Sequence, residues 1–187
     1  MPISRSQQGV SLLELLIVVV IITIGAGLAA PSWSQILDNT QRRSTTANLV
    51  LLFNVARNTA VSEAVNVTVC PLDNSLKCSK DWSRPVSAFR DPNRLRSVVE
   101  EAQIIRVVEP PKRGQLKGAT GIRNYFAFRP DGTARDAIGH VIWCASDNDP
   151  RKASQIRVNM GGRPIVARDL NGDGIPQDAQ GKPLSCA

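Results

Sequence analysis

Four cysteines are the residues whose chemistry is easiest to anticipate in this 187-residue chain. They all follow a long apolar segment near the N-terminus, in the part that would be translocated into an oxidising compartment, where disulfides form. Four cysteines allow three pairings, and the short loop between Cys70 and Cys78 leaves Cys144 to pair with Cys186. Zinc ligation needs closer pairs than these spacings provide. We therefore expect the disulfides Cys70–Cys78 and Cys144–Cys186.

One carboxylate interrupts the apolar segment. The stretch from Val10 to Ala30 contains no charged residue except Glu14. A carboxylate deep in a membrane segment costs about 2.5–3.5 kcal/mol even on lenient insertion scales. Glu14 therefore needs a partner, which neither a simple anchor nor a cleaved secretory signal would supply.

A short acidic segment near the C-terminus is similar to the start of a calcium loop. Asp169, Asn171 and Asp173 place oxygen atoms at alternate positions, and Gly174 permits a sharp turn. Gln180 stands where an EF-hand has its bidentate glutamate, and no helices are expected on either side. An ordinary Asx and glycine turn is the favoured interpretation, with calcium as the alternative.

Catalytic chemistry is not expected. The single histidine, His140, lies in an apolar run beside Val141 and Trp143, which is typical of a packed strand residue. The chain has no phosphate-binding Gly-Lys-Ser/Thr motif, no histidine cluster and no activated nucleophile motif. We therefore predict that the chain is not an enzyme and that it needs no cofactor, apart from the calcium alternative.

Positive charge gathers in the middle of the chain. The formal net charge is +7, and the segment from Arg84 to Arg135 contains eleven Lys or Arg residues but only five Asp or Glu residues. Such a segment could bind an anion such as DNA if the cations share one exposed face. The sequence cannot place them together, so a solvated basic surface is favoured over a DNA site.

The apolar segment has the length of a membrane-spanning helix. Residues 10–30 are 21 in number, and at about 1.5 Å per residue they would cover roughly 30 Å, the thickness of a bilayer core. A secretory signal is the alternative, but its apolar region is usually shorter, and Pro31 stands where it would be cut. We expect residues 10–31 to form the membrane segment, after a leader at residues 1–9.

The helix should continue beyond Pro31, which is expected to bend it. Trp33 then suits the membrane surface. A stripe with spacing of three and four predicts that one face packs on a core, and it consists of Leu49, Leu52, Phe53, Ala56, Ala60 and Ala64. The opposite face, which we expect to meet solvent, contains Arg42, Arg43, Asn54, Arg57 and Asn58.

Short β-rich runs replace the helical pattern after Asn66. They are separated by turn residues, which favours hairpins in an antiparallel sheet. The runs are residues 67–69, 104–108, 125–128, 140–143 and 155–158. The predicted class is therefore α+β, with residues 32–187 forming the second half of the helix and one globular head. We expect Trp82 and Trp143 to be core or interface residues.

The sequence from Gln8 to Ile17, QGVSLLELLI, resembles the class III signal of type IV pilins and type II secretion pseudopilins. The resemblance implies that a prepilin peptidase cuts between Gly9 and Val10 and methylates the new N-terminus. Glu14 matches the family's glutamate and Pro31 its helix-bending proline, whereas Val10 departs from the usual Phe or Met. Between subunits, the new amine and the Glu14 carboxylate could neutralise each other.

The head resembles the GspH/FimT group of minor pilins. The resemblance lies in the order of four short motifs after Cys70-Pro71 and Cys78: Asp81-Trp82-Ser83, Ala88-Phe89-Arg90-Asp91, Phe128-Arg129-Pro130-Asp131-Gly132 and Gly162-Arg163. It implies the type IV pilin fold, with a long bent helix packed on an antiparallel sheet. It also implies a minor subunit that primes pilus assembly near the tip and supports twitching motility and adhesion.

The same resemblance implies a cellular location and partners, and it leaves two alternative functions. It places the chain in the inner membrane with its head in the periplasm, and later in the filament with other minor and major pilins. One alternative is a DNA-binding minor pilin for DNA uptake through Arg163 and Arg168, although the second arginine of the group's motif is displaced here. The other alternative is a minor pseudopilin of a type II secretion system.

Overall fold

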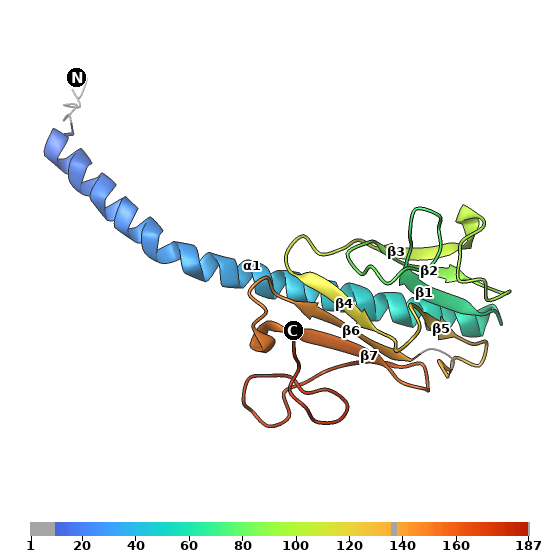
Figure 1. Cartoon of the computed structure of the whole chain (residues 1–187). Helices are drawn as coiled ribbons and strands as arrows, with labels where there is room; N and C mark the ends of the chain where they lie inside the picture. The colour runs from blue at the N-terminus through green and yellow to red at the C-terminus, as the bar shows by residue number, and fades with distance from the viewer. Residues whose placement is uncertain (1–9, 136–137, 187) are drawn as a thin grey trace, which may run out of the picture. The chain divides into compact units, whose positions relative to one another are not determined.

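A computed structural model describes residues 10–135 and 138–186 of the chain, and for residues 26–32 it describes the backbone alone. The chain divides into two compact units, Met1–Leu37 and Asp38–Ala187, and one helix begins in the first unit and ends in the second (Figure 1). We call the second unit the head. It contains every strand found over the described residues.

Helix α1 spans Leu12–Ser62, 51 residues, and includes Pro31. The Ser11 hydroxyl caps its first turn by accepting a hydrogen bond from the Glu14 amide at 3.2 Å. Ala64 ends it in the left-handed conformation, with φ +52°, and the Val65 amide bonds back to the Ala60 carbonyl at 3.2 Å. Ala64 is exposed, so its predicted place in the core stripe is wrong. The bend at Pro31 stays a prediction.

Over the described residues, the head contains two antiparallel sheets of four strands each. The first has the order β3-β2-β1-β5, with β1 at Val67–Pro71, β2 at Val86–Arg90, β3 at Ile104–Val108 and β5 at Phe126–Phe128. The second has the order β4-β6-β7-β8, with β4 at Gln115–Ala119, β6 at Gly139–Cys144, β7 at Ser154–Val158 and β8 at Pro164–Val166. Short 3-10 turns at Glu101–Gln103 and Pro150–Lys152 precede β3 and β7.

The helix stripe holds the two sheets together in one core. Its buried members contact strand residues of both sheets, and α1 runs along them in Figure 1. The stripe residues are Leu49, Leu52, Phe53, Ala56 and Ala60. Phe53 is fully buried, with its ring 4.9 Å from that of Phe126 and 6.4 Å from that of Phe128. Trp82 and Trp143 are core residues, as predicted.

Arg57 was expected to face solvent, and that prediction is wrong. Its side chain is partly buried, and Nε donates a hydrogen bond to the Gly132 carbonyl at 3.0 Å. The turn at residues 130–132, predicted from Pro130-Asp131-Gly132, thus lies against the last part of α1. A long side chain can cover apolar surface while its charged end reaches a carbonyl, which periodicity alone does not reveal.

All four cysteines are in disulfides, with the predicted pairing. Cys70–Cys78 joins the end of β1 to the loop that follows it. Cys144–Cys186 fixes the C-terminal segment to β6, where the Lys117 ammonium also donates to the Cys186 carbonyl at 2.6 Å.

Candidate functional site

The first part of α1 is apolar on every side. Its large apolar side chains between Leu12 and Ile24 are all 46% exposed or more within this chain. A helix of this kind is normally buried in a large core or in a membrane. Trp33, further along the first unit, is 66% exposed. We call this apolar segment, residues 10–25, the assembly helix, and it is the candidate functional site.

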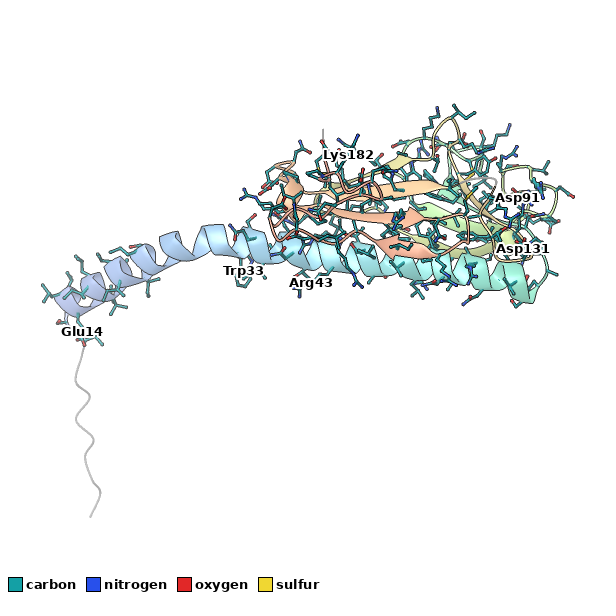
Figure 2. All side chains as sticks on the ribbon, turned by 90° about the horizontal axis from the view of Figure 1, so that it is seen from below. Glu14, Trp33, Arg43, Asp91, Asp131 and Lys182 are labelled. Carbon is teal, nitrogen blue, oxygen red and sulfur yellow. A yellow bond between two sulfur atoms is a disulfide. The ribbon has the colours of Figure 1, made fainter. Side chains whose placement is uncertain are left out.

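Glu14 is the one charged residue of the assembly helix and lies in its first turn. Figure 2 shows it at the start of α1. The helix end favours a carboxylate at this position by about 0.3–1 kcal/mol. Ser11 and Glu14 have the spacing of a capping box, a signal that could have predicted the Ser11 cap and that our sequence analysis missed.

The structure describes only some of the residues predicted to act in processing and assembly. Gly9 lies outside the described residues, and Val10, 71% exposed, lies just before α1. Pro31 is part of the helix, but its side chain falls in the undescribed range 26–32. Cleavage between Gly9 and Val10, methylation and the role of Pro31 stay predictions. Among the described residues, no helix is both long enough and apolar enough to cross a bilayer.

The two arginines proposed for DNA lie at opposite ends of β8. Arg163 is exposed in the turn before the strand, and Arg168 is exposed just after it. Five extended residues span roughly 16 Å, so the pair does not form a compact site. Arg168 instead shares a shallow groove with Arg157 of β7. DNA binding through Arg163 and Arg168 stays a prediction.

The predicted calcium oxygens are already engaged in a turn. The Asp169 carboxylate accepts the amides of Gly172 and Gly174, each at 2.8 Å, and the Gly174 bond is the main reason that the pKa of Asp169 is lowered. Asp173 accepts the Ile175 amide at 2.8 Å. Over the described residues no group of three or more metal-ligating His, Cys, Asp or Glu side chains occurs. The calcium site stays a prediction.

Gln177 is a residue of this loop that the sequence did not point to. Its side chain accepts the Leu170 amide at 2.6 Å and donates to Asn171 Oδ1 at 2.8 Å. It is 5% exposed, so the loop folds around it. No local pattern marks such a residue, because its partners become neighbours after the loop has closed.

His140 lies on β6 and is half-buried. Burial lowers the pKa of its imidazole, and the nearby Asp178 carboxylate offsets part of that effect. The histidine is therefore neutral at pH 7. In the second sheet it is paired in register with Arg157 of β7.

A long N-terminal helix with an exposed apolar first part, followed by a disulfide-bonded α+β head, defines a pilin-like subunit. Residues 45–162 match the family model described as Type II transport protein GspH, and residues 4–30 match the one described as Prokaryotic N-terminal methylation motif. The first match covers more than half of the chain, so the chain belongs to the GspH family. It is a minor pilin or pseudopilin, a structural protein and not an enzyme.

The fold is shared with a solved structure. The crystal structure of the type IV minor pilin FimU from Pseudomonas aeruginosa strain PAO1 in space group P21 has 16% sequence identity and a TM-score of 0.52, covering 79% of this chain and 96% of that one. The same protein in space group P65 has 16% identity and a TM-score of 0.49, covering 67% and 92%. A search of curated proteins gave no match.

Proposed function

We propose that this chain is a minor pilin that helps prime assembly of a type IV pilus and is incorporated at or near its tip. Prepilin peptidase would remove residues 1–9 between Gly9 and Val10, consistent with the N-terminal methylation motif. Before assembly the subunit would sit in the inner membrane with its head in the periplasm, a compartment that suits its two disulfides. Its partners would be other minor and major pilins.

The observation that carries this proposal is the exposure of the assembly helix. Its side chains are almost all Leu, Ile and Val, and burying each one contributes about 1.5–3 kcal/mol. The corresponding helices of other pilin subunits are the occupants we propose, because they would present the same apolar surface. A bundle of such helices removes the surface from water without any contribution from the head.

Glu14 gives that bundle its register. The cut would create an α-amino group on Val10, four residues before Glu14, and its positive charge could pair with the carboxylate of a neighbouring subunit. In a dry filament centre an unpaired charge is costly, so the pair disfavours every register that separates the two groups. Before assembly, the positive end of α1 partly compensates the carboxylate.

The proposal is tested by incorporation of Glu14 variants. In a strain lacking the gene, wild-type, Glu14→Ala and Glu14→Gln chains are expressed, and immunoblots compare sheared surface filaments with membranes. We expect both variants to reach the membrane normally and to be reduced well over tenfold in filaments, because removing one partner of a buried ion pair costs about 3–5 kcal/mol. Glu14→Gln removes the charge but keeps the size of the side chain, and both variants keep the backbone amide that the Ser11 hydroxyl caps.

Glu101→Ala is the matched control, since Glu101 is an exposed head carboxylate, and it should incorporate like wild type. Equal incorporation of Glu14→Ala would contradict the proposal. The deletion strain itself should lose surface pili. Normal pili with impaired export of secreted enzymes would instead assign the chain to a type II secretion pseudopilus, the alternative that the GspH family description keeps open.

A further inference from the structure

One edge of the second sheet is open. Strand β8 is the last in the order β4-β6-β7-β8, so in the described part of the head it has a strand neighbour on one side only. The Ala167 amide donates a hydrogen bond to the Gln155 carbonyl of β7 at 2.9 Å. Backbone groups of successive residues in an antiparallel strand point to alternate sides, so those of Val166, the residue before, point away from β7. Val166 therefore presents one N–H and one C=O group that a further strand could bond.

Two shallow hollows meet at Val166, and together we call them the edge groove. The first, of about 510 Å³, is lined by residues 164–168 and by Arg157, among others. Arg157 alternates along β7 with the core residues Ile156 and Val158, so this hollow lies on the outer face of the sheet. The second, of about 340 Å³, is lined mainly by α1 and therefore lies on the opposite face. An extended segment along the β8 edge would have a hollow on either side.

Four arginines line the edge groove. Arg157 and Arg168 belong to the first hollow, and Arg42 and Arg43 belong to the second. Arg43 lies on the part of α1 that is in the head (Figure 2). None of the four forms an ion pair with a carboxylate of the described residues. Asp178 is the single carboxylate among the described lining residues, so the formal charge of the lining is +3.

Asp178 does not neutralise these arginines. Its Oδ1 atom accepts the amides of Gln180 and Lys182 at 2.8 Å and 2.9 Å, which closes a turn of the C-terminal segment. Arg42 donates to the Arg151 carbonyl at 3.5 Å, a long bond to a neutral acceptor. Hydrogen bonds between a guanidinium and a carboxylate are roughly twice as strong as neutral ones. The edge groove therefore favours a ligand that brings carboxylates.

Apolar side chains lie beside the arginines in both hollows. Leu170 is 77% exposed in the first, where Ile165 of β8 is partly buried. Ala47 and Val50 line the second. Side chains of an extended peptide alternate between two faces, so a peptide along the edge would direct successive side chains into opposite hollows. Each hollow offers cations and apolar surface, which suits a segment of acidic and aliphatic residues.

We propose that the edge groove binds an extended acidic segment of another protein, which adds to β8 as a strand. The segment's backbone would bond the free N–H and C=O groups of Val166, and its carboxylates would pair with the arginines. A second copy of this chain does not fit, because pairing of two β8 strands would bring both sets of arginines together, and like charges across strands are destabilising. Pro164 has no N–H group and further limits unselective pairing at this edge. The edge groove goes beyond the assembly function, and either proposal can fail alone.

Binding is tested on the full chain in detergent at low salt, by fluorescence anisotropy of labelled seven-residue peptides. The probe alternates glutamate with valine. One control has lysine in place of glutamate, and another keeps the glutamates but is methylated at its internal backbone amides. We expect saturable binding of the probe, none of the lysine peptide, and binding of the methylated peptide weaker by about tenfold or more, because its strand donors are lost. Equal binding of the methylated peptide would show that charge alone attracts the probe and would overturn the proposal.

Variants locate the binding. Arg157→Gln and Arg43→Gln remove one cation from each hollow and should each weaken probe binding about tenfold or more, as expected for a lost charge-assisted hydrogen bond. Arg123→Gln, at an exposed arginine of neither hollow, makes the same charge change and should bind like wild type. Thermal melts of all three should stay near that of wild type. Absence of probe binding or unchanged affinity in both groove variants would contradict the proposal, and crosslinks joining two chains through residues 164–168 would assign the edge to a second copy and contradict it as well.

Discussion

At the residue scale, the end of the head depends on one close approach of two backbones. Gly162 follows β7, and a Cβ atom there would lie 2.1 Å from the Gly132 carbonyl oxygen. The same carbonyl accepts the Arg57 Nε hydrogen bond from α1. Helix, 130–132 turn and β7–β8 turn therefore meet at a point where no side chain fits.

Gly162→Ala should consequently destabilise the head more than Gly172→Ala. Both glycines have positive φ, +72° and +80°, but a Cβ at Gly172 meets nothing within 4 Å. We expect Gly172→Ala to lower the free energy of unfolding by about 1 kcal/mol, the cost of the left-handed conformation alone. Gly162→Ala should lower it by about 3 kcal/mol, because backbone must also move. Denaturant melts measure both, and equal effects would contradict the close approach.

Residue types and spacing predicted some sites and not others. The cysteine pairing and the isolated charge of Glu14 follow from the chain itself, because few alternatives exist for either. Asp91 lay in a quoted motif without any role, since its partner Thr68 is 23 residues away and becomes a neighbour through strand pairing.

At the element scale, the helix and most of the strands could be predicted from the sequence, but three strands could not. The helix stripe was predicted from periodicity and five strand regions from β-rich runs between turn residues, and the bounds of those strands lie within two residues of the ones found. The predictions omitted β2, β4 and β8. In β4, Gly118 is a poor strand residue locally, yet a Cβ there would lie 2.0 Å from the Trp82 ring. Tertiary packing thus selects a residue that strand propensity disfavours.

The stripe predicts a sharp contrast within one helix turn. Phe53 is 0% exposed and contacts the rings of two β5 residues, whereas Leu51, two positions earlier, is 45% exposed. Phe53→Ala should lower the free energy of unfolding by about 3–5 kcal/mol, through lost burial and a remaining cavity. Leu51→Ala should change it by about 0.5 kcal/mol or less. Chemical denaturation of both variants checks this, and a small effect at Phe53 would place the core elsewhere.

At the scale of the whole molecule, stability and assembly belong to different units. Among the side chains that the structure describes, the buried core residues all lie after Asp38, in the head, whereas the large apolar side chains of the first unit are exposed. The charges divide in the same way. Residues 1–37 contain Arg5 and Glu14 and sum to zero, so the formal charge of +7 belongs to the head. The head thus has the buried core and the net charge of a soluble domain, whereas the first unit has the exposed apolar surface that a helix bundle would bury.

Removing the assembly helix should therefore yield a soluble, folded protein. We expect residues 34–187, secreted to an oxidising compartment, to form both disulfides and to remain monomeric without detergent, since the fragment retains the core and the net positive charge. The mature chain should remain in solution only with detergent, because its apolar residues have no cover in the monomer. Light scattering coupled to size exclusion compares the two. A mature chain that is monomeric without detergent would show that α1 does not need neighbouring helices, and the assembly proposal would lose its physical basis.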